Sequence, residues 1–373
     1  MKKMIIKCAL FVCILSAFLS CKQDSLIFKG KIYDINSQKL IEKATLSIES
    51  RRTGTNAKGE FDIRDLKTNL DYYIRIEHEN YVTVVRRIRF TAGGNISLNF
   101  PLIPRGKEQR FNAADSIVIK EPGGFSIEVK PNSFITKDKG TYTGEVAIRA
   151  TFINPKENNF IVASPSTFIT SDNKPLQTYG MAEIYATTPK GERLDIRKDR
   201  PVKITIPNIS GLIAGTGLYR LNMENGLWIR EGEFSLNTQT NTLSGMVTSI
   251  SSAWNADQPC SNTLVCIRVQ VVDNNNTPRP GYFIGAKGLS YLGYTGLFQT
   301  DANGYVNLYV CPNSVFKFVG DIIPCCDPGS VPGTPEHTFC CVNGGQIQGP
   351  AVDMNTVNLT PPCTDLGQVI LNP

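Results

Sequence analysis

Cysteines are the residues of this sequence whose type and spacing most clearly predict chemistry, because eight of them lie in the last third of the chain. The chain of 373 residues has eleven cysteines, and the other three are Cys8, Cys13 and Cys21. An even number of cysteines in an exported chain is typical of disulfide bonds. Their pairing is not determined by the sequence. The candidates are Cys260, Cys266, Cys311, Cys325, Cys326, Cys340, Cys341 and Cys363.

Two adjacent pairs stand out, Cys325-Cys326 and Cys340-Cys341. A bridge within such a pair forces strained geometry, so we expect bonds between the pairs. These would staple the loop 324–345, whose prolines and glycines cannot build a core of their own. The alternative is a four-thiolate zinc site, which needs reducing conditions and usually shows CxxC spacing. The sequence therefore favours disulfides over a metal.

Groups that could perform catalysis are scarce. The chain has two histidines, His78 and His337, in different predicted modules, so no zinc peptidase site can be drawn, and we expect both on solvated loops. Motifs for a serine nucleophile elbow, a phosphate loop, a dinucleotide site or a zinc protease are absent from the sequence. We predict no catalytic residue, no metal and no cofactor. An enzyme remains open only as a glycosidase-type pair of loop carboxylates.

The N-terminal segment predicts export and a lipid anchor. Lys2, Lys3 and Lys7 precede an apolar run, 8–19, that is shorter than the roughly twenty residues of a bilayer span. Ser20 before Cys21 resembles the lipobox of bacterial lipoproteins, although Phe18 and Leu19 depart from its usual residues. The resemblance implies that the signal peptide 1–20 is removed and that Cys21 carries lipid at the start of a tether, 21–25. The alternative is an ordinary secretory signal cleaved near Ser20.

The residues after Cys21 predict the destination. Lys22-Gln23-Asp24 resembles the tags of surface-exposed lipoproteins of the Bacteroidetes, which implies a lipid anchor in the outer membrane and exposure on the cell surface. The chain has 39 Lys and Arg against 33 Asp and Glu, and removing the three signal lysines leaves 36 against 33. This balance gives no basic field, so we expect no nucleic-acid partner.

The elements that must position these residues are strands. Apolar and polar residues alternate with a period of two, and 31 glycines and 22 prolines suit frequent turns. The sequence predicts an all-β chain of two or three tandem Ig-like or transthyretin-like β-sandwich domains. We expect these modules to follow one another as a rod.

The first predicted module covers 26–104, with strands at 28–34, 44–48, 72–76 and 85–90. It resembles the carboxypeptidase regulatory-like domain, a transthyretin-like β-sandwich. The resemblance implies a fold and carries no peptidase activity with it. It runs through Gly30, Asp34, Ala44, Gly59, Phe61 and Tyr81.

The second predicted module covers 110–257. Its strand order resembles the β-rich segment of cartilage intermediate layer proteins and, more distantly, the sandwich shared by netrin receptors. Some relatives cleave themselves at His-Phe-Ser, but this chain has Ile250-Ser251-Ser252 there. Without an adjacent base Ser252 is a poor nucleophile, so we expect no self-cleavage. Trp228 and Trp254 are predicted in the core, the alternative being platforms that stack on glycans.

The third predicted module covers 260–373 and holds the cysteine-rich region. A strand at 266–273 and a hairpin at 300–310 containing Thr-Asp-Ala-Asn-Gly again resemble the carboxypeptidase regulatory-like domain. Asp273 with the asparagines 274–276 is expected to form a hairpin turn. The alternative is a calcium loop, but the spaced carboxylates of an EF-hand are missing.

Together these features predict a non-catalytic, lipid-anchored surface protein that binds a glycan or protein ligand or serves a structural role. The first alternative is an accessory subunit that docks on an outer-membrane transport or secretion complex. An enzyme with a carboxylate pair is the second alternative.

Overall fold

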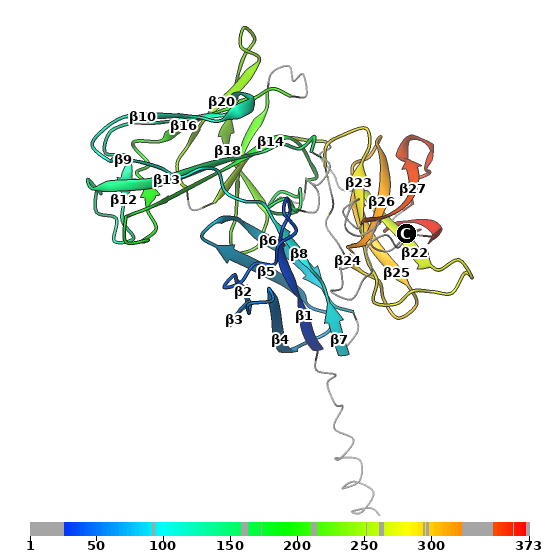
Figure 1. The fold of residues 1–373 in the computed structure, drawn as a ribbon. Coiled ribbons are helices and arrows are strands. Elements are labelled where there is room, and N and C mark those ends of the chain that lie inside the picture. The colour runs from blue at the N-terminus through cyan, green and yellow to red at the C-terminus, as the bar shows by residue number, and fades with distance from the viewer. Residues whose placement is uncertain are drawn as a thin grey trace, which may run out of the picture.

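A computed structural model gives the fold (Figure 1), and it describes residues 26–91, 94–157, 163–172, 174–209, 215–250, 252–260, 265–293, 295, 298–322, 346–360 and 362–370. Several predictions lie outside these residues: the signal peptide, the lipidation of Cys21, the position of His337 and the staple between the two adjacent cysteine pairs. Over the described ranges no helix is both long and apolar enough to cross a membrane.

The predicted all-β class is confirmed, because the described elements are strands apart from short 3-10 turns. The first module (26–104) is a sandwich of two sheets. One has the order β4(Glu60–Leu66), β1(Leu26–Asp34), β7(Gly94–Ser97), with β8(Phe100–Leu102) also on β1. The other has the order β3(Arg51–Gly54), β2(Thr45–Ile48), β5(Asp71–His78), β6(Tyr81–Arg89). Alternate residues of β5 are buried, as a strand with one face on the core requires.

Gly30 and Asp34, two of the residues that carry the resemblance to the carboxypeptidase regulatory-like domain, have clear physical roles. A side chain at Gly30 would place its Cβ 1.9 Å from the Leu98 carbonyl oxygen, so only glycine fits there. Asp34 Oδ1 accepts the N–H groups of Asn36 and Ser37, and its Oδ2 accepts the Tyr81 hydroxyl at 2.9 Å. Asp34 thus closes a turn and ties it to β6.

The second module (109–259) is a larger sandwich. One sheet has the order β10(Ile117–Lys120), β11(Ser126–Val129), β16(Val202–Pro207), β20(Thr242–Val247), β19(Ser235–Asn237). The facing sheet has the order β18(Trp228–Glu233), β17(Gly217–Leu221), β21(Ala253–Pro259), β14(Leu176–Thr187), β13(Glu145–Ile153), β9(Gln109–Asn112), and β12(Phe134–Ile135) pairs with β15(Asp195–Ile196). The core between the sheets includes Phe125, Phe134 and Trp254.

The third module (265–370) has one sheet of β25(Tyr305–Val310), β22(Val265–Val272) and β28(Thr364–Ile370), and another of β24(Phe298–Gln299), β23(Phe283–Gly288), β26(Val315–Ile322) and β27(Gln346–Asp353). Phe316 and Phe318 of β26 pack in its core. Asp273 Oδ1 accepts the N–H groups of Asn275 and Thr277, which is the predicted hairpin turn.

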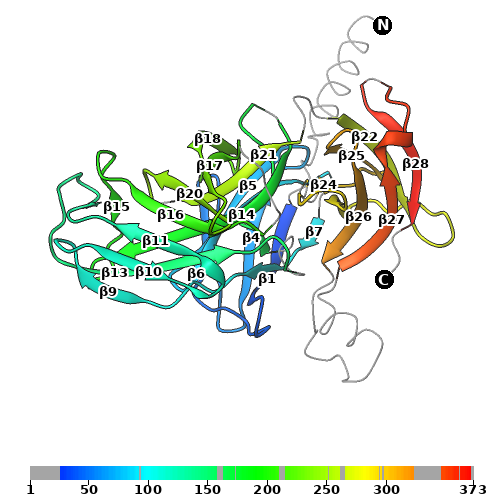
Figure 2. The ribbon, with the colours of Figure 1, turned by 90° about the horizontal axis from the view of Figure 1, so that it is seen from above.

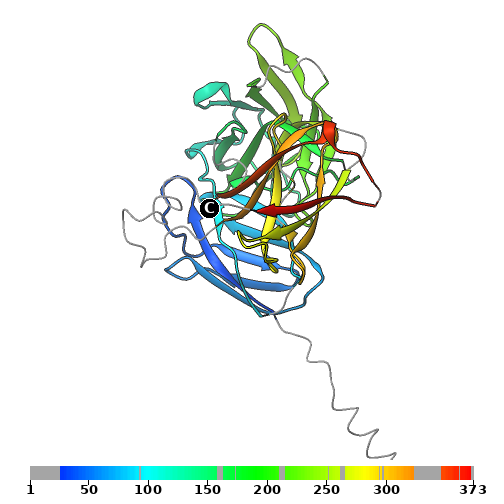
Figure 3. The ribbon, with the colours of Figure 1, turned by 90° about the vertical axis from the view of Figure 1, so that its right-hand side faces the viewer.

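The predicted rod is wrong, because the three modules meet around a shared junction (Figures 1 and 2). Val82 of the first module, Trp228 of the second and Val319 of the third belong to one buried cluster. The Thr178 N–H of the second module also donates to the Leu292 carbonyl of the third at 2.7 Å. Figure 3 views the molecule with the third module in front of the other two. Side chains that point outward from one sandwich are thereby buried against a neighbouring module.

Candidate functional site: a groove between the first and third modules

A groove of about 310 Å³ lies where the outer face of β5 and β6 meets the outer face of β22 and β25. Its volume is near the lower end of the roughly 300–1,000 Å³ typical of small-molecule sites. Strand alternation explains the lining, because Arg87 and Arg89 flank the buried Ile88, and Tyr305 and Asn307 flank the buried Val306. The lining residues are Asp71, Arg87, Arg89, Thr91, Arg268, Phe298, Gln299, Asp301, Tyr305, Val306, Asn307 and Tyr309.

The two walls are held together by contacts in and beside the groove. The Thr91 N–H donates to Gln299 Oε1 at 2.7 Å, and its hydroxyl donates to the Thr300 carbonyl at 2.6 Å. Phe283 of β23 packs edge-on against Phe90 and joins the core of the first module. These contacts connect the two walls of the groove directly.

The wall from the first module presents one ion pair and one further arginine. Arg87 Nη2 lies 2.7 Å from Asp71 Oδ2. Burial lowers the pKa of Arg87, but the hydrogen bond and charge of Asp71 outweigh it, so the pKa is raised. Asp71 Oδ1 and Arg87 Nε are buried and have no hydrogen-bond partner among the described residues. Arg89 is exposed and donates to the Asn69 carbonyl at 3.3 Å.

The wall from the third module presents a stacked arginine and tyrosines. The Arg268 guanidinium lies 4.1 Å from the centre of the Tyr305 ring and has no carboxylate partner in the described part of the chain. Stacking on an aromatic face fixes the orientation of the guanidinium fork. Tyr309 is 37% exposed. Asp301 Oδ1 accepts the N–H groups of Asn303 and Tyr305, so this carboxylate closes the β-turn before β25.

The arrangement favours binding over glycoside hydrolysis. Hydrolysis needs one carboxyl group that holds a proton at neutral pH, which an apolar environment provides. Asp71 instead pairs with the Arg87 guanidinium, and Asp301 accepts two backbone N–H groups, so both carboxyl groups are already held by structural partners. Arginine forks, hydroxyl groups and aromatic rings on fixed strands are the chemistry of recognition.

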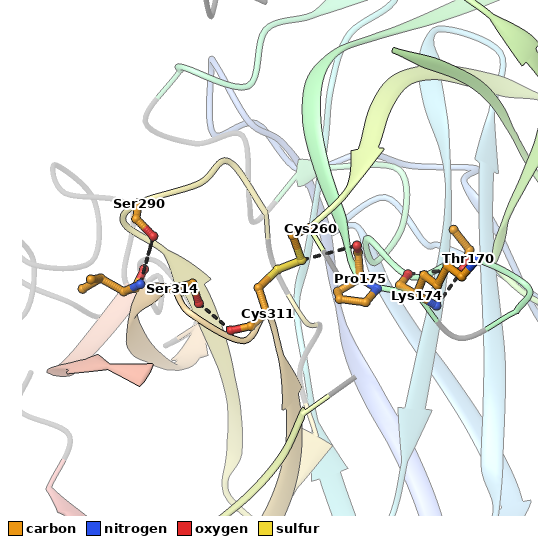
Figure 4. The surroundings of a disulfide bond; sticks show 8 residues. Thr170, Lys174, Pro175, Cys260, Ser290, Cys311 and Ser314 are labelled. Carbon is orange, nitrogen blue, oxygen red and sulfur yellow. Dashed lines mark hydrogen bonds between the residues drawn. A yellow bond between two sulfur atoms is a disulfide. The ribbon is translucent and has the colours of Figure 1, made fainter. Parts of the chain in front are cut away.

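The structure contains two disulfide bonds between cysteines that were predicted to form them. Cys266 at the start of β22 pairs with Cys363, which lies just before β28. Cys260 pairs with Cys311 (Figure 4), and the Cys260 N–H donates to the Pro175 carbonyl at 3.0 Å. Cys260 directly follows β21, so its bridge ties the second module to the third. Cys325, Cys326, Cys340 and Cys341 lie outside the described residues, and their bonds stay predictions.

The other singled-out residues are structural. Trp228 and Trp254 are 0% and 1% exposed, so they are core residues as predicted and not glycan platforms. Ser252 is buried, and its hydroxyl donates to the backbone carbonyls of Leu221 and Ala253. The prediction of a solvated loop for His78 is wrong. His78 ends β5, is half-buried, and packs edge-on against Tyr81, because the hairpin to β6 folds the two rings together.

Sequence reasoning missed the groove residues. Arg87, Arg89, Arg268, Tyr305 and Tyr309 occupy outward positions of predicted strands, where arginine and tyrosine are common on any solvated face. The signal that could have found them was arginine and tyrosine alternating with buried positions in two separate strands. Nothing local indicates that these two faces oppose one another.

The comparisons with known proteins give short or distant matches. No family model matches the sequence. Cartilage intermediate layer protein 2 of Homo sapiens is 32% identical over 111 residues, which is 27% of this chain and 9% of that protein. Cartilage intermediate layer protein 1 of Sus scrofa is 29% identical over 129 residues, 32% of this chain and 21% of that protein. The chain thus matches only a small part of these relatives.

Among solved structures, the major pilin subunit BcpA of Bacillus cereus aligns over 93% of this chain and 99% of its own, with 10% identity and a TM-score of 0.20. A protein of unknown function from Bacteroides fragilis aligns over 63% of this chain and 98% of its own, with 9% identity and a TM-score of 0.19. We draw no functional argument from TM-scores this low.

Proposed function

We propose that this protein is a non-catalytic lipoprotein of the outer membrane that binds a ligand at the cell surface in the groove between its first and third modules. The groove carries the proposal, because its walls come from two modules held in fixed register and its lining is rich in hydrogen-bonding groups. The proposed anchor is lipid on Cys21, as implied by the resemblance of the N-terminal segment to lipoprotein signals. The tether would hold the modules at the membrane and leave the groove accessible.

The anchor is tested by expressing the full chain and the Cys21→Ser variant in a Bacteroidetes host with labelled palmitate. We expect label and membrane association for the natural chain and loss of both for C21S. Protease shaving of intact cells should digest the modules. A protected ectodomain would contradict surface exposure, and an unlabelled natural chain would contradict the anchor.

Ligand binding at the groove is tested with a bulky side chain inside it. Asn307 is exposed on β25 and lines the groove, so Asn307→Trp should fill it without disturbing a core. The matched control is Asn237→Trp, also at an exposed strand position but in β19 of the second module. We expect glycans or proteins captured from the native environment to be lost with N307W and retained with N237W. Equal capture by both variants, or a stoichiometric outer-membrane partner as the only captured molecule, would overturn the proposal in favour of an accessory subunit.

A further inference from the structure

We infer that the groove recognises a saccharide bearing an anionic group, a carboxylate or a sulfate; the inference rests on the proposed function of the groove. The lining supplies three features that such a ligand needs together: cations without carboxylate partners, an exposed aromatic ring, and side-chain hydrogen-bonding groups on rigid strands.

The charges point to an anion. Three arginines line the groove against two aspartates, an excess of one positive charge. Asp71 neutralises Arg87, whereas Arg89 and Arg268 have no carboxylate partner among the described residues. The remaining carboxylate, Asp301, closes its turn through Oδ1. Two arginines on opposite walls are therefore available to bind one carboxylate or sulfate, because a planar guanidinium group donates two parallel hydrogen bonds to such an anion.

The remaining lining suits a sugar ring. Tyr309 offers an exposed ring, and a sugar has an apolar face that packs against an aromatic ring while its hydroxyls reach polar groups. Asn307 is exposed in the lining and can both donate and accept hydrogen bonds to such hydroxyls. The unpartnered Asp71 Oδ1 is a further acceptor.

An extended peptide fits this groove less well. The one aliphatic lining residue, Val306, is only 6% exposed, so the lining has no pocket for aliphatic side chains. The walls are made by side chains that point off the sheet faces, as the alternation of Arg87 to Arg89 and of Tyr305 to Tyr309 shows. A peptide that adds as a strand would instead need backbone edges.

The inference is tested by calorimetry and an oligosaccharide array with the full-length ectodomain. The probes are oligogalacturonate, hyaluronan oligosaccharides and sulfated dextran, with neutral dextran oligosaccharides and tri-glutamate as comparisons. The double variant Arg89→Gln with Arg268→Gln removes both guanidinium groups that have no carboxylate partner among the described residues. Its matched control, Arg52→Gln with Arg230→Gln, removes the same charge from exposed positions outside the groove. Arg268→Lys keeps the charge but loses the fork.

We expect an acidic saccharide to bind, with at least about tenfold weaker affinity for R89Q/R268Q, a clear loss for R268K and no change for the control pair. Binding that prefers carboxylated or sulfated probes identifies which anion is recognised. Stronger binding of neutral dextran or tri-glutamate, no binding of any acidic saccharide, or equal loss in the control pair overturns the inference. In those cases the proposed function still stands if N307W, but not N237W, abolishes capture of another ligand. Circular dichroism of each variant checks that the sheets are intact.

Discussion

At the residue scale, the most unusual group is the carboxyl of Asp257, which is fully buried in β21 between β14 and β17. Asn255 Nδ2 donates to its Oδ2 at 2.6 Å, while Oδ1 has no hydrogen-bond partner within the described ranges. Burial raises the pKa of Asp257 well above that of a free aspartate. The folded protein therefore favours the protonated form of this residue.

Asp257 should make stability depend on pH. Because its pKa is higher in the folded state, its contribution is fully present below about pH 4, where a free aspartate titrates, and is lost as the pH rises toward the folded-state pKa. Asp257→Asn mimics the protonated form, so its stability relative to the natural chain should increase from pH 4 to pH 8 by up to about 1.4 kcal/mol per pH unit. Urea unfolding across this range measures it. A D257N difference that does not change with pH would contradict the assignment.

A second residue-scale prediction concerns the buried pair of Arg105 and Glu183, whose side chains are 1% and 5% exposed. Arg105 also donates to the backbone carbonyls of His78 and Glu79, so it joins the first module to the second. Glu183→Gln leaves the Arg105 guanidinium buried without a counter-charge, so it should lower the free energy of unfolding by about 3–5 kcal/mol. The half-exposed pair of Lys203 and Glu128 provides the control, since Glu128→Gln should cost at most about 1 kcal/mol. Similar losses in chemical denaturation for the two variants would refute the argument.

At the scale of elements, one face of a strand packs in the core of its module while the other forms a surface toward a neighbouring module. In β26, Phe316 and Phe318 fill the core of the third module, while Val319 on the opposite face of the strand packs in the junction. In β6, Ile88 faces the core while Arg87 and Arg89 face the groove. The same period of two that builds each sandwich therefore also builds the surfaces between modules.

The two described disulfides should have different consequences at this scale. Each should stabilise by about 2–4 kcal/mol by restricting the unfolded chain. Cys266→Ala with Cys363→Ala removes a bridge inside the third module, so it should lower that module's own transition. Cys260→Ala with Cys311→Ala removes the bridge between modules, so it should separate the transitions of the second and third modules in scanning calorimetry. Identical thermograms for the two variants would argue against an intermodule role for Cys260.

At the scale of the whole molecule, the junction decides the shape. Val82, Met181, Trp228 and Val319 are each at most 1% exposed although they come from three different modules. Their burial removes apolar surface that separate modules would present to water. The groove exists only because this junction and the contacts of Thr91 hold the first and third modules together.

Breaking the junction should extend the molecule. Val319→Arg places a charge in the shared cluster, and an unpaired buried charge is strongly unfavourable, so the third module should move away while its own core of Phe316 and Phe318 stays intact. Small-angle scattering should give a larger radius of gyration, with an unchanged β signal in circular dichroism. Val118→Arg, on an exposed face of β10, should leave the radius unchanged. An unaltered radius for V319R would contradict a junction held by this cluster.

The sequence by itself determined the strands, their turns and the chemistry available to the chain. Alternation in β5 or β6, the turn around Asp273 and the buried place of Trp254 are local or nearly local, because backbone geometry and hydrophobic burial act residue by residue. Only the tertiary structure decided that Cys260 pairs with Cys311, that His78 is half-buried, that Arg105 meets Glu183, and that Arg89 and Arg268 face one groove. Apart from His78, which packs within its own hairpin, these residues meet partners in another module. An outward position has the same local pattern whether it meets water or another module, so the pattern cannot tell a solvated face from an interface.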